Sequence, residues 1–158
     1  MWTNFLTFLR QLLSNYVLAC AAAAWMTAQL LKLPINYLAT KKWDWMILIS
    51  PGGMPSSHSA ISTATALAIG LYEGFDSSLF ALATALATIV VYDAVSIRRQ
   101  AGFHAEWINK IVEEILKGGN FSYKKLQEVL GHTPFEAMAG IILGFCMALI
   151  MWVIYFGT

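Results

Sequence analysis

Apolar residues dominate four stretches of the chain, each long enough, or nearly so, to cross a membrane as a helix. A hydrocarbon core about 30 Å thick requires roughly 20 helical residues. The four stretches cover about residues 12–31, 56–71, 77–97 and 134–156. The pattern therefore predicts an all-α integral membrane protein, folded as a single domain over residues 1–158 with a bundle of about four transmembrane helices.

Breaks and polar stretches separate these predicted spans. Pro34 should stop the first span, because a proline in a helix interior removes a hydrogen bond and clashes with the preceding turn. Residues 98–133, between the last two spans, are largely polar. Two short helices are expected there, over 105–116 and 123–130, with a glycine-rich break at 118–120. The sequence thus predicts a polar helical insertion between the last two transmembrane helices.

The last predicted span contains Gly140 and Gly144 in a GxxxG spacing. Small residues one helical turn apart let two helices approach closely, because no side chain separates their backbones. The spacing therefore predicts a close helix contact, either within the chain or across a homodimer.

Composition supports a membrane location and narrows the function. Charged residues make up 12% of the chain, against about 25% in soluble domains, and the mean hydropathy is +0.62. The net charge of +1, without a basic run interleaved with aromatics, gives no reason to expect a nucleic-acid partner. Cys20 and Cys146 lie in apolar stretches, so we expect buried thiols and neither a disulfide framework nor a metal site.

Basic residues fall almost entirely on one side of the predicted four-span topology. Arg10 alone lies on the side of the two termini and the 72–76 turn. The other side holds Lys32, Lys41, Lys42, Arg98, Arg99, Lys110, Lys117, Lys124 and Lys125. Because short cytoplasmic loops carry the excess of lysine and arginine, this second side is predicted to be cytoplasmic.

The three histidines, His58, His104 and His132, share that side with Glu136. Each of these groups, taken alone, has an ordinary explanation as an anchor at the membrane interface. Ionisable groups that gather at one membrane depth more often mark a functional site. We therefore expect one site at the cytoplasmic ends of the spans.

The segment 52–59, GGMPSSHS, opens the second span. Glycine permits close backbone approach, and the free N–H groups of a helix that begins at Ser56 and Ser57 attract an anion. His58, in the first turn, is placed to donate a proton to a leaving oxygen. The alternative is an ordinary serine cap followed by a polar residue at the interface.

The segment 131–136, GHTPFE, opens the last span. Thr133 as N-cap, Pro134 at the first position and Glu136 three residues after the cap form a capping box. Glu136 therefore has a purely structural explanation. In the functional alternative, its carboxylate binds a ring N–H of His132 and fixes the tautomer whose other nitrogen is nucleophilic.

Arg98 and Arg99 follow the third span, and each guanidinium offers a planar fork that fits phosphate oxygens. Anchoring at the membrane interface is the alternative role. Asp93 lies in the apolar part of that span, where an unpaired carboxylate is costly. It is therefore expected to pair with a nearby arginine or lysine and so to support the site.

Three motifs in this order resemble the type 2 phosphatidic acid phosphatase and vanadium haloperoxidase superfamily, and in particular its divergent bacterial and plastid branch. They are GGMPSSHSA at 52–60, YDA at 92–94 followed by RRQAG at 98–102, and GHTP at 131–134. The resemblance covers nearly the whole chain. It implies a multi-pass protein of a bacterial inner membrane or a plastid membrane.

Carried over residue by residue, the resemblance implies that His132 is the nucleophile, that Glu136 orients it, and that His58 is the general acid. It also implies a phosphate site made by Lys32, Ser56, Ser57, Arg98 and Arg99. Ser57 stands where the family usually has glycine, Glu136 where it has aspartate, and residues 39–40 where it has Arg-Pro. The family mechanism uses no metal and no cofactor.

The sequence therefore predicts a membrane-embedded phosphatase that hydrolyses a phosphomonoester or diphosphate headgroup of a lipid through a phosphohistidine. Its expected partners are that phosphorylated lipid and the bilayer. The alternative is a membrane protein that binds or translocates a phosphate-bearing lipid without hydrolysing it. Phosphatidylglycerol phosphate, phosphatidic acid and polyprenyl phosphates or diphosphates all fit, and a cytoplasmic site favours the first two.

Overall fold

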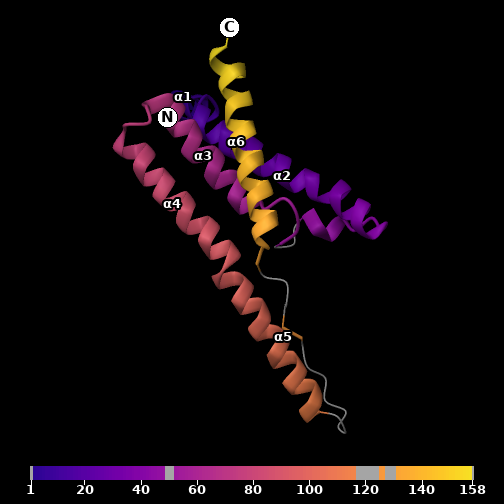
Figure 1. The fold of residues 1–158 in the computed structure, drawn as a ribbon. Coiled ribbons are helices and arrows are strands. Elements are labelled where there is room, and N and C mark those ends of the chain that lie inside the picture. Colours follow the sequence, from indigo (N-terminus) through magenta and orange to yellow (C-terminus); the bar gives the residue numbers. More distant parts are fainter. Residues whose placement is uncertain (1, 49–51, 117–124, 127–130, 158) are drawn as a thin grey trace.

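Every regular element in the described part of the chain is a helix (Figure 1). The computed structural model describes residues 2–48, 52–116, 125–126 and 131–157. The elements are α1 Trp2–Leu13, α2 Tyr16–Thr40, the 3₁₀ helix η1 Trp45–Leu48, α3 Ser57–Glu73, α4 Ser78–Val95, α5 Ile97–Ile115 and α6 Pro134–Phe156. The all-α fold class predicted from the sequence is confirmed.

Three helical stretches are long and apolar enough to cross a membrane, namely Tyr16–Thr40, Ser78–Ile115 and Pro134–Phe156. The second of them combines α4 with α5. Helix α3 has 17 residues and therefore rises about 25 Å, somewhat less than a hydrocarbon thickness of about 30 Å. The predicted count of about four crossings is thus not confirmed, since the described residues supply three by length and composition.

Helix α3 lies at the centre of the bundle and packs against α2, α4 and α6 (Figure 1). Its contact with α6 is close because Gly140 and Gly144 face the α3 backbone. A Cβ at these two positions would collide with the carbonyl oxygens of Ser56 and Ala60, respectively. The GxxxG spacing therefore serves a helix contact within the chain.

Helix α2 begins later and ends later than the hydrophobic pattern predicts. Asn15 caps it by accepting a hydrogen bond from Leu18 N at 3.0 Å. The helix then continues through Pro34 to Thr40, so the prediction that Pro34 stops it is wrong. Proline removes one hydrogen bond, but its fixed φ suits a helix, and Pro34 lies at an exposed position of α2.

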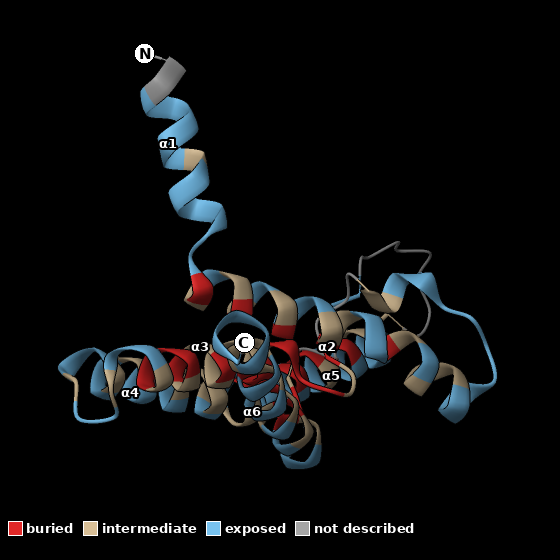
Figure 2. Ribbon diagram, turned by 90° about the horizontal axis from the view of Figure 1, so that it is seen from above, coloured by how far each residue is buried: buried red, intermediate tan, exposed pale blue. Residues whose placement is uncertain are grey.

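Helix α1 is an additional element before the first span, from which Ser14 and Asn15 separate it. It projects from the bundle and is exposed along almost all of its described side chains (Figure 2). The buried residues of the molecule lie instead mainly where α2, α3 and α6 meet (Figure 2).

Helix α5 follows α4 after a break at Ser96 and extends away from the other helices (Figure 1). The sequence predicts that the first short helix of the polar segment spans 105–116, but one helix occupies Ile97–Ile115 instead. Its first turns contain arginine, glutamine and alanine, which are good helix formers despite their polarity or small size. Polarity alone therefore misled the prediction of where this helix starts.

The rest of the predicted insertion is only partly described. Within 123–130, the structure describes Lys125 and Leu126, and neither is helical; the 118–120 break lies outside the described residues. Asn109 of α5 donates its side-chain N–H to Leu126 O and accepts from Leu126 N, both at 2.9 Å. The polar insertion is thus not confirmed in the predicted form.

The two ends of the bundle differ in chemistry. At the end where α2 begins, the Tyr16 ring lies 5.4–6.2 Å from the rings of Tyr72, Trp152 and Tyr155. The Tyr16 hydroxyl also donates to Ala148 O at 3.3 Å. At the opposite end α3 and α6 begin, and most of the predicted site residues lie there.

Candidate active site

Backbone hydrogen bonds tie three helix ends together at the polar end of the bundle. Ser56, the N-cap of α3, donates its backbone N–H to Glu136 O in the first turn of α6 at 3.0 Å. His132, just before α6, donates its backbone N–H to Ala94 O near the end of α4 at 2.9 Å. The starts of α3 and α6 are therefore fixed to each other and to α4.

His58 and His132 are brought together by this arrangement. Their ring centroids are 6.1 Å apart and their planes are inclined by 59°. His132 is 3% exposed, and His58 Nδ1 is buried without a hydrogen-bond partner among the described residues. A buried polar atom in this state calls for an explanation, and a bound group that hydrogen-bonds to it is one.

Glu136 makes both of the contacts that the sequence offered as alternatives. Its Oε2 accepts a hydrogen bond from Thr133 N at 2.9 Å, and Thr133 Oγ1 accepts from Glu136 N at 3.3 Å, which completes the capping box. The same Oε2 lies 3.3 Å from His132 Nδ1. One carboxylate oxygen thus serves the helix cap and the histidine, with the shorter distance to the cap.

Lys32 comes to the same place from the middle of α2. It is 2% exposed, and no hydrogen bond or ion pair engages its ammonium within the described part of the chain. Its side-chain stem lies 3.9 Å from the position that a Cβ on Gly53 would take. The ammonium is close enough for its charge to act on His58, His132 and Glu136.

The first turn of α3 offers backbone N–H groups to the site. Ser56 Oγ accepts from Ser59 N at 3.3 Å and from Ser59 Oγ at 3.1 Å, so the Ser56 side chain is engaged in capping. Ser56 and Ser57 are both buried. The remaining N–H groups of this turn, with the positive end of the helix dipole, favour an anion beside His58.

The two arginines occupy different environments. Arg98 Nε donates to Asp93 Oδ2 at 2.6 Å, which is the pairing expected of a carboxylate in an apolar span. Arg98 is half-exposed, and its charge acts on His58. The Arg99 guanidinium instead lies 5.4 Å from the centre of the Phe103 ring. The charge of Arg98 therefore acts on His58, whereas the described contact of the Arg99 guanidinium is with Phe103.

Two positions that sequence reasoning did not select help to build the site. Gly131 packs against the backbone of Arg98 and Arg99 so closely that a Cβ would collide with Arg99 N. Ala94 is buried and supplies the carbonyl that holds His132. A glycine directly before a candidate histidine was the available signal for the first. Ala94 belongs to the YDA motif at 92–94, but it acts through its backbone carbonyl, so its residue type did not indicate this role.

Burial lowers the pKa of His132 below its usual value of 6.5, and the charges of His58 and Lys32 act in the same direction. The hydrogen bond and the charge of Glu136 oppose this shift. His132 is consequently neutral at pH 7. With Nδ1 directed at Glu136, the neutral tautomer leaves a lone pair on Nε2.

The third histidine, His104, is exposed on α5, where it borders a surface hollow with Tyr92 and Gln100. It therefore differs from His58 and His132, whose rings face each other. Among the described residues, no group of three or more histidine, cysteine, aspartate or glutamate side chains is placed to hold a metal ion.

These features define an all-helical, multi-pass membrane protein with two histidines, a buried lysine and a helix N-terminus gathered at one end of its bundle. The chain belongs to the divergent PAP2 family, whose model matches residues 13–147. The matched region contains all of the candidate site residues, and the family resemblance read from the three motifs is confirmed.

A related bacterial protein supports the assignment of this chain to the membrane. The uncharacterized membrane protein YuiD of Bacillus subtilis (strain 168) is 40% identical over 152 residues, a match that covers 89% of this chain and 96% of that protein. No solved structure matches the chain.

Proposed function

We propose that this protein is a lipid-phosphate phosphatase that hydrolyses a phosphomonoester or diphosphate headgroup through a phosphohistidine. The observation that carries the proposal is the buried Lys32 ammonium, without an ion-pair partner in the described chain, beside the His58–His132 pair. An uncompensated buried charge costs several kcal/mol, and a bound anion would remove that cost. Phosphate is an anion that a neutral histidine can also attack.

The first chemical step forms a bond between His132 Nε2 and phosphorus while the bond from phosphorus to the leaving oxygen breaks. His58, protonated at the start, gives its proton to that oxygen, and the lipid alcohol (or, from a diphosphate, the lipid monophosphate) departs. In the second step water attacks phosphorus and His58 takes a proton from it. The P–N bond breaks, and inorganic phosphate and neutral His132 are released.

The positive groups around the histidines stabilise the charge on the phosphoryl oxygens. Lys32 and the α3 N-terminus approach from the bundle, and Arg98 approaches from the first turn of α5, held by Asp93. Phosphoryl transfer depends mainly on such positioning and electrostatic stabilisation. Arg98 is the phosphate arginine in this proposal because its charge acts on His58, whereas Arg99 lies over Phe103.

The proposal counts α3 as a fourth crossing and places the site on the cytoplasmic side. A short turn joins α3 to α4, and the two helices pack against each other, so a membrane-crossing α4 carries α3 at a similar depth. The shortfall of a few ångströms in length costs only fractions of a kcal/mol per Å. With four crossings, the uneven distribution of lysine and arginine favours a cytoplasmic site.

The test is phosphate release by the purified protein in lipid nanodiscs, with phosphatidic acid, phosphatidylglycerol phosphate and a polyprenyl diphosphate as separate substrates. His132→Ala should lower kcat by about 10³-fold or more, because no other group forms the covalent intermediate. His104→Ala is the matched control and should resemble wild type. Phosphate release that survives in His132→Ala would exclude this mechanism.

A second function, binding or translocating a phosphate-bearing lipid without hydrolysis, has one observation in its favour. Glu136 Oε2 lies nearer to Thr133 N than to His132 Nδ1, at 2.9 and 3.3 Å, a geometry that serves the cap better than the nucleophile. In that case the wild-type protein would bind the phosphorylated lipid, Lys32→Met would lose binding, and none of the substrates would release phosphate.

A further inference from the structure

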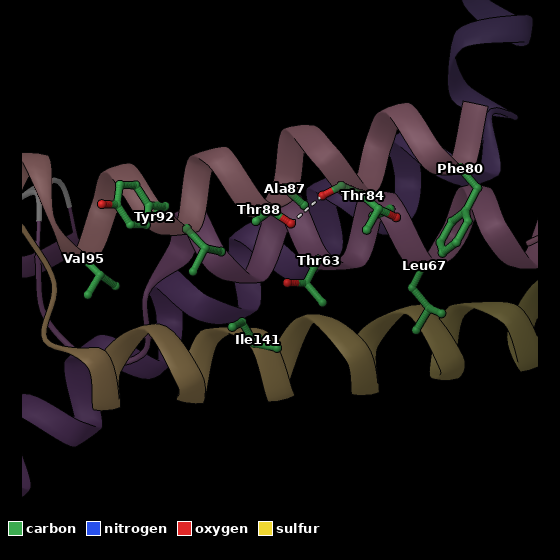
Figure 3. Close-up of a pocket in the computed structure, with 11 residues that line it drawn as sticks. Thr63, Leu67, Phe80, Thr84, Ala87, Thr88, Tyr92, Val95 and Ile141 are labelled. Carbon is green, nitrogen blue, oxygen red and sulfur yellow. Dashed lines mark hydrogen bonds between the residues drawn. The ribbon is translucent and has the colours of Figure 1, made fainter. Parts of the chain in front are cut away.

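An apolar groove runs along α4 where this helix faces α3 and α6 (Figure 3). Its volume is about 600 Å³, within the range of about 300–1,000 Å³ that small-molecule sites occupy. The walls include Leu67 of α3, Phe80, Ala87 and Val95 of α4, and Ile141 of α6. Helices α3 and α6 are in close contact at Gly140 and Gly144 of α6, and the groove lies where α4 faces these two helices.

The groove is elongated and has a defined direction. Its α4 residues extend from Phe80 to Val95, which corresponds to about 22 Å along a helix. The Val95 end is next to Ala94, the residue whose carbonyl accepts the His132 N–H. The Phe80 end lies towards the turn between α3 and α4, at the opposite end of the bundle. The groove therefore runs along a membrane-crossing helix from the end of the bundle that holds the candidate phosphate site.

The groove lining is mainly apolar and does not require a polar ligand. Thr88 Oγ1 donates to Thr84 O at 2.9 Å, so this hydroxyl is satisfied by its own helix (Figure 3). The other α4 residues that line the groove between Phe80 and Val95 are Thr84, Ala87, Val91 and Tyr92, and with Leu67, Phe80, Val95 and Ile141 they leave the walls mainly apolar. A hydrocarbon chain is the ligand that such walls suit, since it forms dispersion contacts and leaves no hydrogen bond unmade.

We propose that this groove binds one hydrocarbon chain of the lipid whose phosphate lies at His58 and His132. The inference rests on the proposed function for the headgroup and adds where the chain lies. A lipid in a bilayer carries its phosphate at one end and its chain along the membrane normal, which is the relation between the histidine pair and the groove. The occupant is therefore the substrate's own chain and not a bystander lipid.

Photo-crosslinking of the full-length protein tests the site independently of turnover. The probes are phosphatidic acid and a polyprenyl phosphate, each with a diazirine at the end of its chain, in phosphatidylcholine nanodiscs. Adducts should fall on groove residues near Phe80 and Leu67, and the probe that labels more strongly identifies an acyl or an isoprenoid chain. Leu86 and Ile89, which are exposed on α4 and do not line the groove, report labelling by bulk lipid.

A groove-filling substitution tests the effect on catalysis. Ala87→Trp should lower the ratio of kcat/KM for a long-chain phosphatidic acid to that for a short-chain analogue by at least about tenfold, because several methylenes lose their burial. Leu86→Trp adds the same side chain on the exposed side of α4 and should leave this ratio unchanged. Equal loss on both substrates in Ala87→Trp would contradict a chain-specific groove.

The outcomes separate the two proposals. Groove labelling without phosphate release would overturn the phosphatase and retain the chain site. Phosphate release with adducts spread equally over the groove and over Leu86 and Ile89 would overturn the chain site alone. Equal groove labelling by a diazirine phosphatidylcholine, which lacks a phosphomonoester, would make the occupant an ordinary bilayer lipid and would also overturn the inference.

Discussion

Single residues at the polar end of the bundle combine structural and chemical tasks. Glu136 illustrates this most clearly, because one carboxylate oxygen receives the Thr133 N–H of the α6 cap and faces His132 Nδ1. Lys32 is the reverse case, a buried charge whose described surroundings include no direct counter-ion. Substitutions at such residues distinguish stability from function, since the two tasks need different properties of the same side chain.

Substitutions at Glu136 separate its role in capping α6 from the effect of its negative charge. Glu136→Gln keeps an acceptor for Thr133 N, so the free energy of unfolding should change by less than about 1 kcal/mol. Loss of the negative charge removes the group that orients His132 and stabilises its charged form, so kcat should fall on the order of 10²-fold or more. Glu136→Asp, which restores the family's usual residue, should retain part of the activity. Phosphate release and thermal unfolding are the measurements, and equal near-native rates in both variants would leave Glu136 as a cap only.

The lowered pKa of His132 predicts how stability depends on pH. Burial favours the neutral ring in the folded state, while the unfolded chain protonates near 6.5. Below that pH the unfolded state binds more protons, so this contribution is complete above 6.5 and is lost as pH falls towards the lower folded pKa. The Tm of wild type should therefore fall more between pH 7 and pH 5 than that of His132→Asn. Parallel Tm curves for the two proteins would show that His132 is not held neutral.

At the scale of elements, the contact between α3 and α6 sets the geometry of the site. Gly140 and Gly144 face the carbonyls of Ser56 and Ala60, and the same helix ends are joined by the hydrogen bond from Ser56 N to Glu136 O. The distance between His58 on α3 and His132 before α6 therefore depends on how closely these helices approach. A substitution that moves these two helices apart should therefore alter the site even though neither histidine is changed.

Gly140→Ala tests this dependence. In an isolated helix the substitution would stabilise by about 1 kcal/mol, but here the added Cβ collides with Ser56 O. We expect a net destabilisation of about 1–3 kcal/mol, as in other overpacked cores, together with reduced activity. Ile142→Ala, at an exposed position between the two glycines, is the control and should affect both less. A raised Tm in Gly140→Ala would show that the helices are not in close contact.

At the scale of the whole molecule, polar and aromatic residues occupy opposite ends of the bundle. The histidine pair lies where α3 and α6 begin, and the ring cluster around Tyr16 lies where they end. Three described helical stretches are able to cross a membrane, so these two ends correspond to its two sides. The groove along α4 lies between these two ends.

The distribution of charge predicts a cytoplasmic site, and cysteine labelling tests this prediction. Lys42→Cys, after α2 at the polar end, should be protected in intact cells from an impermeant thiol reagent and should react after the membrane is opened. Glu73→Cys, at the other end of α3, should react in intact cells if α3 crosses. Cys146→Ala removes the exposed native thiol from the background. Reaction of Lys42→Cys in intact cells would place the site outside, and protection of both would show that α3 does not cross.

The sequence by itself determined the features that depend on local physics. Helix α6 occupies 134–156 as predicted, because its apolar length, its proline at the first turn and its capping box all lie within the helix itself. The starts of α3 and α4 also follow from adjacent serine caps. The candidate site residues could be named for a similar reason, since their types and order carry the family resemblance.

Only the tertiary structure decided the features that depend on contacts between distant residues. Helix α2 continues through the exposed Pro34 to Thr40, and the GxxxG pair lies against α3 because the chain supplies that surface itself. The effect of the Arg98 charge on His58, the burial of Lys32 and the groove along α4 likewise arise only when separate helices meet. The helix propensity of a residue does not depend on residues that are distant in the sequence. These features therefore follow only from three-dimensional packing.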